Sequence, residues 1–346
     1  MAKYIEIASR KIGIDYAPLV IAEIGINHNG SLVEAKKLVD AAKSAGAEVV
    51  KHQTHIVDAE MSEVAKQAIP GNSEFSIWDI MSRCALSEKD ETELKRYTES
   101  LGMIFISTPF SFAAVDRLEE MGVPAYKIGS GEMNNYSFVR YVASKGKPII
   151  LSTGMNDLQA VQKAVACIQE YHDNFAILHT TNLYPSTPEQ IRLGALEELK
   201  NAFPEEIVGL SDHSLNNLAC LAATALGASI LERHFTDTKS RKGEDIVCSM
   251  DVDECRDLIK SCVEIAKMRG GSKKPLPEEQ VTIEFAFSTI VAACDMPAGH
   301  IITREDLTTK RPYLRGILAS DMDKIIGKTT TEPIKVGTHL EWKDIA

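Results

Sequence analysis

Nowhere does the sequence contain an apolar run of about 18 residues, the length that a helix needs to cross a bilayer. Residues 1–6 also lack the apolar stretch of a secretory signal. The seven cysteines form no C-x-x-C pair, and we interpret them as buried thiols in a reducing compartment. These absences predict a cytoplasmic protein with no membrane segment.

Basic residues are scarce relative to acidic ones, because 38 Lys and Arg accompany 49 Asp and Glu and the formal net charge is -11. Nucleic acid repels a chain of this charge, and we therefore expect no nucleic-acid partner. A small anionic substrate would need the positive groups to be gathered in one cleft. The hydrophobic fraction of 44% is ordinary for a globular protein, and 346 residues suit one large domain and one small one.

Short apolar runs rich in β-branched residues alternate with helical patterns along most of the chain. Each run is typical of a buried parallel strand, and segment 31–45 carries the single apolar stripe of a helix that covers a sheet. Eight such units predict an α/β fold, the (β/α)8 TIM barrel; an open doubly wound sheet is the alternative, although it usually has fewer strands. The predicted strands are 19–25, 47–54, 103–109, 125–132, 148–154, 175–181, 207–213 and 229–236.

Two further segments depart from the barrel pattern. Residues 55–87 form a connection too long for an ordinary loop, which predicts a lid or binding loop or else a decorative insertion. The barrel domain is predicted to cover residues 1–269, and the polar, proline-containing stretch 270–284 is predicted to be a linker. Short strand and turn patterns then predict a small separate domain over residues 285–346.

Polar side chains stand at the carboxyl ends of all eight predicted strands, where barrels of this kind hold their catalytic groups. Strands that end so consistently in ionisable and hydroxyl groups indicate a polar ligand at this rim. The residues are Glu23, Lys51, Gln53, Ser107, Thr108, Lys127, Ser130, Glu132, Ser152, Thr153, His179, Asn182, Ser211, Asp212, His213, Glu232 and His234.

Two lysines in this set suggest a site for a small phosphorylated carboxylate. Lys51 and Lys127 end different strands, and the hydroxyl groups of Thr108, Ser130, Ser152 and Ser211 accompany them. Ammonium and hydroxyl groups together can satisfy several anionic oxygens. The alternative is that each lysine is merely an exposed charge at a strand end.

His213 and His234 end neighbouring predicted strands, one strand–helix unit apart. Both imidazoles could therefore bind one divalent ion of the Mn²⁺ type and leave its other positions to water and substrate. The alternative is a pair of hydrogen-bonded histidines without a metal. Glu23, Glu132 and Asp245 are candidates for acid–base chemistry or for binding sugar hydroxyls.

The chain resembles the N-acetylneuraminate (sialic acid) synthase family from about residue 10 to its end. The small domain, with Lys310, Arg311 and Pro312, is similar to the antifreeze-like (SAF, β-clip) domain of that family. The resemblance is carried by the stretches IAEIGINHNGS (21–31), AGAEVVKHQTHI (45–56), FISTPFS (105–111), AYKIGSGEMNN (125–135), PIILSTGM (148–155), HTTNLYP (179–185), GLSDHS (209–214) and LERHFTD (231–237).

This resemblance implies a reaction and a set of partners. Phosphoenolpyruvate would condense with an N-acylated amino sugar in its open-chain aldehyde form and release phosphate by C–O cleavage. The metal would be divalent, most often Mn²⁺, with Mg²⁺ or Co²⁺ as alternatives. The protein would be a homodimer in which the small domain of one subunit caps the barrel of the other.

The resemblance also implies roles for individual residues. His213 and His234 match the metal ligands of the family. The match to the phosphoenolpyruvate ligands covers Lys51, Thr108, Lys127, Ser130, Ser152, Asn182 and Ser211, and the match near the sugar covers Glu23, Gln53, Glu132, Tyr184 and Asp245. Arg311 matches an arginine that reaches the sugar of the partner subunit, but Tyr313 stands where the family commonly has glycine, so Arg315 is an alternative.

Other activities remain open from the sequence. The first expectation is an N-acetylneuraminate synthase that uses N-acetylmannosamine. Legionaminate and pseudaminate synthases, which use diacetamido-trideoxy sugars, would share most of these motifs. A metal aldolase on the same barrel is a more distant alternative, and a saccharide-binding or ice-binding protein is suggested by the small domain alone.

Overall fold

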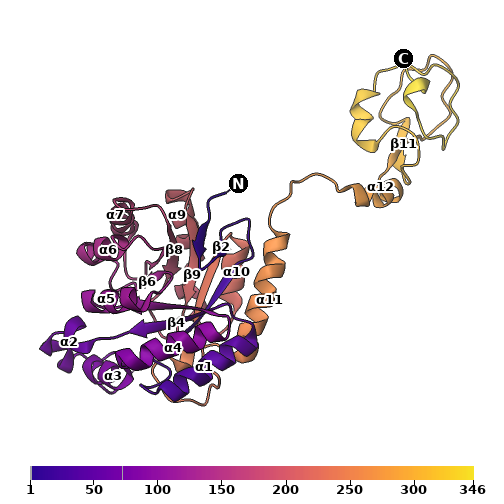
Figure 1. Ribbon diagram of the computed structural model, residues 1–346. Coiled ribbons are helices and arrows are strands. Elements are labelled where there is room, and N and C mark those ends of the chain that lie inside the picture. Colours follow the sequence, from indigo (N-terminus) through magenta and orange to yellow (C-terminus); the bar gives the residue numbers. More distant parts are fainter. Residues whose placement is uncertain (1, 72) are drawn as a thin grey trace. The chain divides into compact units, whose positions relative to one another are not determined.

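The computed structural model describes residues 2–71 and 73–346. The chain forms two compact units, Met1–Gly270 and Gly271–Ala346. The first unit contains the predicted barrel and the second contains the predicted small domain (Figure 1). Among the described residues, no helix is both long enough and apolar enough to cross a membrane.

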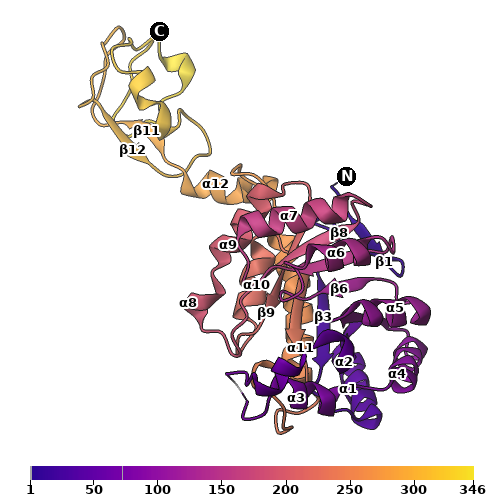
Figure 2. The ribbon, with the colours of Figure 1, turned by 90° about the vertical axis from the view of Figure 1, so that its left-hand side faces the viewer.

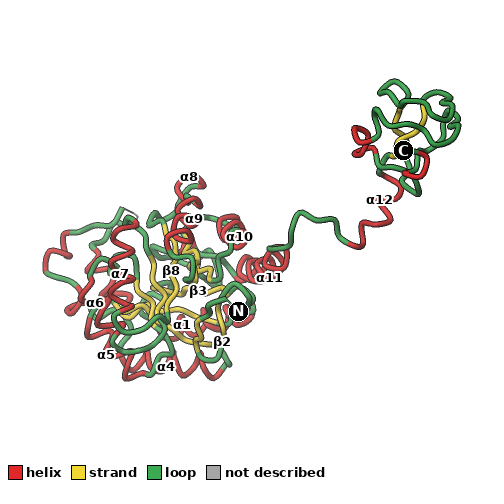
Figure 3. The backbone as a smooth tube through the Cα atoms, turned by 90° about the horizontal axis from the view of Figure 1, so that it is seen from above, coloured by secondary structure: helices red, strands yellow, loops and turns green. Residues whose placement is uncertain are grey.

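Parallel strands close into a barrel in the order β10-β3-β4-β5-β6-β7-β8-β9. The predicted TIM barrel is therefore confirmed, and the alternative of an open sheet is wrong. Figure 3 shows the strands enclosed by helices. The strands are β3 (Leu19–Gly25), β4 (Val49–Thr54), β5 (Ile104–Pro109), β6 (Tyr126–Ile128), β7 (Ile149–Ser152), β8 (Phe175–Thr180), β9 (Ile207–Asp212) and β10 (Ile230–His234).

Helices between the strands cover the outside of the barrel (Figure 2). Several begin at a Ser or Asp whose side chain accepts a backbone N–H, and Asp251 and Glu254 form a capping box. The helical segment 188–202 is broken at Arg192, whose φ of 53° is left-handed. The helices are α1 (Leu32–Ala45), α4 (Glu88–Ser100), α5 (Phe112–Met121), α6 (Tyr136–Ala143), α7 (Leu158–Gln169), α8 (Pro188–Ile191), α9 (Leu193–Ala202), α10 (Leu218–Ala225) and α11 (Val252–Met268).

Alternate residues of each strand face opposite sides, and this alternation builds two apolar layers. The inner layer fills the barrel with residues such as Ile21, Val49, Ile106 and Ile230, while the outer layer packs the strands against the helices. A hairpin that the sequence analysis did not predict, β1 (Ile5–Ile7) with β2 (Arg10–Ile12), adds three isoleucines to the inner layer.

The long insertion after β4 is largely ordered into short helices. They are α2 (Val57–Glu60), the 3₁₀ helix η1 (Glu63–Gln67) and α3 (Ile77–Cys84). Ile80 and Cys84 of α3 pack against Ile26 in a small separate cluster. A further 3₁₀ turn, η2 (Ile246–Cys248), follows β10 on the way to α11.

The second unit has its own apolar core, which includes Ile290, Ile302, Ile317 and Leu340. Part of the predicted linker is helical, because η3 (Pro277–Glu279) and α12 (Gln280–Ala286) lie within or across residues 270–284. Two antiparallel strands follow, β11 (Thr289–Ala292) and β12 (Leu307–Lys310), and the unit is completed by the 3₁₀ helices η4 (Ala319–Lys324) and η5 (Trp342–Asp344).

Candidate active site

The polar residues at the barrel rim continue the inner face of the strands. Because the strands are parallel, their carboxyl ends meet at one rim, and the inward alternation that places Val49 in the core also turns Lys51 and Gln53 inward. The same rule applies on β10, where Ile230 lies in the inner core and Glu232 and His234 follow on the same face. The inner face of these strands is therefore ionic at the rim, although the same face is apolar deeper in the barrel.

Two buried ammonium groups meet one buried carboxylate at the centre of this rim. Lys51 Nζ lies 3.9 Å and Lys127 Nζ lies 3.4 Å from Glu232 Oε1. Lys51 also forms a close ion pair with Glu23. All four side chains are at most 6% exposed. The two lysines, which lie far apart in the sequence, therefore converge.

Hydroxyl groups from neighbouring strands line the same cluster. Lys51 donates a hydrogen bond of 3.0 Å to Thr108 Oγ1, and Lys127 donates one of 2.7 Å to Ser152 Oγ. Ser211 donates to Glu232 Oε1 at 3.1 Å. Two cations with three hydroxyl groups around them form a cradle suited to a small ligand with several anionic oxygens.

Burial and charge oppose each other in the cluster and shift its pKa values in different directions. Burial raises the pKa of Glu23 to about 7, although Lys51 lowers it. Burial would also raise the pKa of Glu232, but Lys127 and Lys51 outweigh it and lower that pKa. The pKa of Lys127 is lowered by burial more than Glu232 raises it. Glu23 is therefore the carboxylate able to exchange a proton near neutral pH.

Ser130 and Asn182 approach each other across the backbone of Gly154. Gly154 N–H donates to Ser130 Oγ at 2.9 Å, and a Cβ at this glycine would lie 1.8 Å from Asn182 Oδ1. Asn182 Oδ1 is buried and has no hydrogen-bond partner among the described residues. A buried polar atom without a partner is costly, which indicates that a ligand group completes the site here.

His213 and His234 lie beside each other at the rim, with ring centroids 5.5 Å apart. His213 Nδ1 lies 2.7 Å from the carbonyl oxygen of Thr181; it therefore donates there, and Nε2 keeps a free lone pair. His234 Nδ1 is buried without a hydrogen bond, and Asp245 Oδ2 lies 3.5 Å away. The ring centroids of Tyr184 and His213 lie 4.0 Å apart.

Burial keeps both imidazoles neutral. Burial and then His234 lower the pKa of His213 to about 4, while burial and then Lys51 lower the pKa of His234 to about 3. Burial raises the pKa of Asp245 to about 6. Neutral imidazoles are the protonation state that binds a metal ion.

Comparison with known proteins identifies the family of this chain. The model of the NeuB family matches residues 38–274, and the model of the SAF domain matches residues 288–346. The chain belongs to the NeuB family. The resemblance seen in the sequence is therefore confirmed, as are the SAF domain and the predicted enzyme class, a sugar-acid synthase.

Relatives of this NeuB-family chain have different sugar products. It is 37% identical over 338 residues to N,N'-diacetyllegionaminic acid synthase of Legionella pneumophila, covering 94% of each chain. It is 32% identical to N-acetylneuraminate-9-phosphate synthase of Homo sapiens, covering 92% of this chain and 90% of that one. A crystal structure of a sialic acid synthetase from Leptospira borgpetersenii, in complex with citrate, has a TM-score of 0.75 and 29% identity, covering 82% of this chain and 96% of that one.

The residues present fit a divalent metal by their donor chemistry. His213 and His234 offer two neutral imidazoles, and Nδ1 of His234 makes no hydrogen bond within the described residues. Within residues 2–71 and 73–346, however, no group of three or more His, Cys, Asp or Glu side chains is arranged to hold a metal ion. Two protein ligands leave most positions to substrate and water, as an open catalytic site requires.

Residues near the predicted sugar position form a second part of the site. Gln53 Nε2 donates to Glu23 Oε1 at 3.0 Å, which places the amide directly on the carboxylate. Glu132 follows β6 and is half-buried, and burial followed by the nearby Glu60 raises its pKa. Glu60, in the insertion after β4, is therefore the charged group that acts on Glu132.

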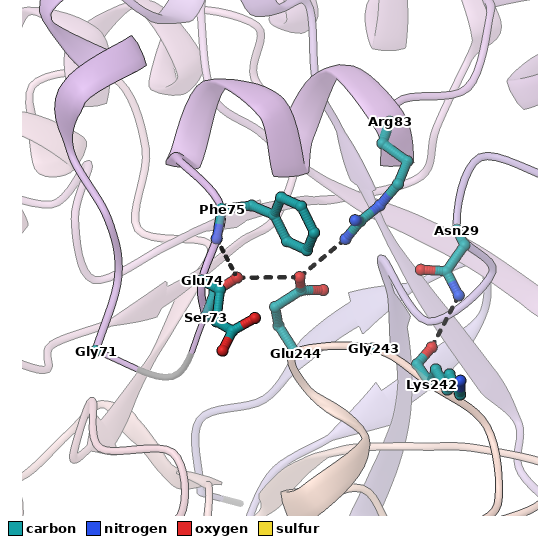
Figure 4. A pocket seen from close by; sticks show the side chains of 9 residues that line it. All are labelled: Asn29, Gly71, Ser73, Glu74, Phe75, Arg83, Lys242, Gly243 and Glu244. Atoms are coloured by element: carbon teal, nitrogen blue, oxygen red, sulfur yellow. Dashed lines mark hydrogen bonds and ion pairs between the residues drawn. The ribbon is translucent and has the colours of Figure 1, made fainter.

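A cavity of about 810 Å³ lies between the insertion after β4 and the loop after β10 (Figure 4). Arg83 of α3 forms an ion pair of 2.8 Å with Glu244, and its guanidinium lies 5.3 Å from the centre of the Phe75 ring. Ser73 also donates to Glu244, at 3.4 Å. Because Glu244 directly precedes Asp245, these contacts tie the insertion to the loop that carries Asp245.

Some residues of the predicted set do not join the site. Three of them lie near strand ends but face outward. Ser107 forms a hydrogen bond with Thr54, and His179 forms one with the carbonyl oxygen of Ile191. Asp212 forms an ion pair with Arg233. Arg311 and Arg315 belong to the second unit, where both are exposed. The sequence analysis assigned no role to Glu232, although its place two residues before His234 is the signal that could have found it.

Proposed function

We propose that this protein condenses phosphoenolpyruvate with an N-acylated amino sugar and releases phosphate. N-acetylmannosamine in its open-chain aldehyde form is the first candidate, and the product would then be N-acetylneuraminate. The single observation that carries the proposal is the buried pair of ammonium groups, from Lys51 and Lys127, that share one carboxylate inside a ring of hydroxyl groups.

The lysine cradle would bind the enol phosphate. Glu23 and Glu232 accompany the two ammonium charges, and the anionic oxygens of phosphoenolpyruvate would supply a competing negative charge. Ser152, Thr108 and Ser211 already donate or accept hydrogen bonds at these atoms and would reorient toward the ligand. As phosphate leaves with the bridging oxygen, the cradle stabilises the charge that moves onto it.

His213 and His234 would hold a divalent ion, Mn²⁺ first and Mg²⁺ or Co²⁺ as alternatives. Such an ion, when bound, supplies Lewis-acid polarisation of the sugar aldehyde oxygen. The hydrogen bond from His213 Nδ1 to the Thr181 carbonyl fixes the ring and leaves Nε2 available, which is the usual outer support of a metal-binding histidine.

Glu23 would manage the proton of the water that adds to C2. C3 of phosphoenolpyruvate attacks the aldehyde carbon, water then adds at C2, and the resulting intermediate expels phosphate by breaking its C2–O bond. The pKa of Glu23, about 7, suits a group that takes a proton from this water at neutral pH. Glu132 is the alternative base, and Asp245, Gln53 and Tyr184 would bind the sugar.

The assembly that we propose is a homodimer with exchanged small domains. Arg311 is exposed directly after β12, and this supports a role in reaching the sugar of the partner subunit, with Arg315 as the alternative. We further propose a cytoplasmic location, in agreement with seven cysteines that are all free thiols.

Another sugar is the second candidate for the same reaction. The relative from Legionella pneumophila is named as an N,N'-diacetyllegionaminic acid synthase and is 37% identical. This similarity favours a diacetamido-trideoxy sugar, of the legionaminate or pseudaminate type, as the alternative substrate.

One experiment tests the reaction and the sugar together. The protein with Mn²⁺ is given phosphoenolpyruvate and each of three amino sugars: N-acetylmannosamine and the legionaminate-type and pseudaminate-type diacetamido sugars. Inorganic phosphate and the product mass are then measured. We expect stoichiometric phosphate only when both substrates are present, and the mass of the condensed acid identifies the sugar. Phosphate released without a sugar, or no condensed acid with any of the three, would overturn the proposal.

A further inference from the structure

A continuous hydrogen-bonded chain runs from the first helix of the lid to the centre of the site. Glu60, the last residue of α2, binds His55 Nδ1 through both carboxylate oxygens, at 3.0 and 3.1 Å. His55 Nε2 lies 3.1 Å from Gln53 Oε1, and Gln53 Nε2 donates to Glu23 Oε1 at 3.0 Å. Glu23 in turn pairs with Lys51.

The direction of each hydrogen bond in this chain follows from its ends. When Glu23 is ionised, its oxygen can only accept, so the Gln53 group beside it is the NH₂ donor. Gln53 then presents its carbonyl oxygen to His55, and Nε2 of His55 must carry the proton. One proton must also lie between His55 Nδ1 and the Glu60 carboxylate. With Glu23 ionised, the Gln53 amide therefore has a single allowed orientation.

Burial makes this chain rigid. The side chains of His55 and Glu60 are 2% and 4% exposed. The imidazole stacks on Phe110 with ring centroids 4.4 Å apart and planes 14° apart. Helix α2 buries no residue outright, so the Glu60 carboxylate is not placed by an apolar face of its own helix. Burying the Glu60 carboxylate costs desolvation free energy, and its hydrogen bonds to His55 offset that cost.

The Gln53 amide also has little space on the side away from His55. Gly25 has a left-handed φ of 44°, and a Cβ there would lie 2.9 Å from Glu23 Oε1 and 3.2 Å from Gln53 Nε2. The Gln53 amide is thus confined between Gly25 and His55. If the amide turned over, its oxygen would face the Glu23 carboxylate, and the two would repel each other.

We propose that His55 and Glu60 are positioning residues that lock the Gln53 amide, a proposed sugar-binding group, in one orientation beside Glu23. Neither needs to touch a substrate. This inference rests on the proposed function, and it deepens it by assigning sugar-side specificity to the start of the lid. Glu60 also acts on the other candidate base, because it contributes to raising the pKa of Glu132.

Leucine and glutamine variants at these positions test the proposal. In Glu60→Leu and His55→Leu, kcat/KM for the amino sugar should fall about tenfold to a hundredfold, because a sugar-binding amide misplaced by about 1 Å is costly. KM for phosphoenolpyruvate should change less than about threefold, since the lysine cradle is untouched. Glu60→Gln, whose amide can donate to His55 Nδ1, should recover most of the activity, whereas the shorter Glu60→Asp should not.

The double variant Glu60→Leu with His55→Leu should be no worse than either single variant, because both act through one chain. The matched control is Glu63→Leu, in the same insertion, whose side chain is 81% exposed and should leave all constants unchanged. Additive losses, equal effects on the two substrates, or a Glu60→Gln as poor as Glu60→Leu would overturn the inference. Should Glu60→Leu fail to fold, Glu60→Gln and Glu60→Asp still decide.

Wild-type turnover separates this inference from the proposed function. If the wild type releases no phosphate with phosphoenolpyruvate and any of the three amino sugars, the proposed function fails. If the wild type is active and the leucine variants match it, only the positioning role of His55 and Glu60 fails.

Discussion

The ammonium nitrogen of Lys127 lies 3.4 Å from Oε1 of Glu232, although the two residues come from strands on different sides of a closed barrel. Lys51 approaches the same oxygen and also pairs with Glu23, so two buried carboxylates accompany two buried cations. This arrangement gathers two ammonium groups at one point of the barrel rim. It explains how a chain of net charge -11 presents a local site for an anion.

Replacing Lys127 should weaken phosphoenolpyruvate binding selectively. In Lys127→Met one of the two ammonium groups is lost, and we expect KM for phosphoenolpyruvate to rise by about tenfold or more, as a charged hydrogen bond is worth roughly 1.5–3 kcal/mol. KM for the sugar should change little. Steady-state kinetics with each substrate varied in turn measures this, with Lys145→Met, at a surface lysine paired with Asp116, as the control. An equal rise in both constants would contradict the cradle.

Removing the divalent ion should abolish turnover reversibly. We expect no phosphate release after treatment with a chelator and recovery on addition of Mn²⁺. His213→Ala should bind Mn²⁺ weakly, by electron paramagnetic resonance, and lose at least about a hundredfold in kcat, because half of the protein ligands are gone. His172→Ala, in the turn after α7, serves as control. Undiminished Mn²⁺ binding by His213→Ala would rule out the ligand role.

A single methyl group at Gly154 should damage the site without damaging the fold. The Cβ of Gly154→Ala would meet Asn182 Oδ1 at 1.8 Å and Ser130 Oγ at 2.9 Å, so that both side chains must move. We expect kcat/KM for phosphoenolpyruvate to fall about a hundredfold. Gly194→Ala in α9, where nothing lies within 4 Å of the added Cβ, is the matched control. Wild-type kinetics in Gly154→Ala would show that Ser130 and Asn182 do not contact the substrate.

The stability of the barrel should fall in acid partly through His28. Burial and then His52 lower the pKa of His28 from 6.5 to about 3. Below pH 6.5 the unfolded chain binds a proton that the folded chain refuses, so the free energy of unfolding decreases as the pH falls toward 3. His28→Asn keeps an acceptor for the N–H of Gly30 but does not titrate, so its loss of stability in acid should be smaller.

Urea unfolding at several pH values measures this difference. In a Trp342→Phe background the remaining tryptophan, Trp78 of α3, reports on the barrel unit alone. His300→Asn, in the second unit, should leave the pH dependence at Trp78 unchanged. If the free energy of unfolding falls equally with pH in His28→Asn and in its parent, other groups cause the loss of stability in acid.

Breaking the lid contact at Arg83 should affect the sugar more than phosphoenolpyruvate. Arg83→Met removes the ion pair with Glu244, which directly precedes Asp245. We expect KM for the sugar to rise about threefold to tenfold, in line with the loss of roughly 1 kcal/mol for a half-exposed ion pair. The control is Arg140→Met, which breaks an exposed pair with Glu170. No change in the sugar constants would show that the lid and Asp245 are not coupled.

Much of the fold could be predicted because its signals are local. Strand residues such as Val49 and Ile106 lie in short apolar runs, and helix α11 begins at a capping box that the sequence shows directly. The break at Arg192 and the isoleucines of the β1–β2 hairpin could not be predicted in the same way. Their stability comes from packing against distant strands rather than from a local pattern.

The sequence by itself determined the barrel and the rim at which the polar residues gather, because the alternation of inner and outer positions is a property of each strand alone. The same alternation turns His52 outward toward Glu91, away from the side of Lys51 and Gln53. Only the tertiary structure decided that Glu232 balances both lysines and that Glu60 and His55 reach Glu23 through Gln53. Such contacts depend on which strand ends lie opposite each other after the barrel closes, and distance along the chain carries no information about that.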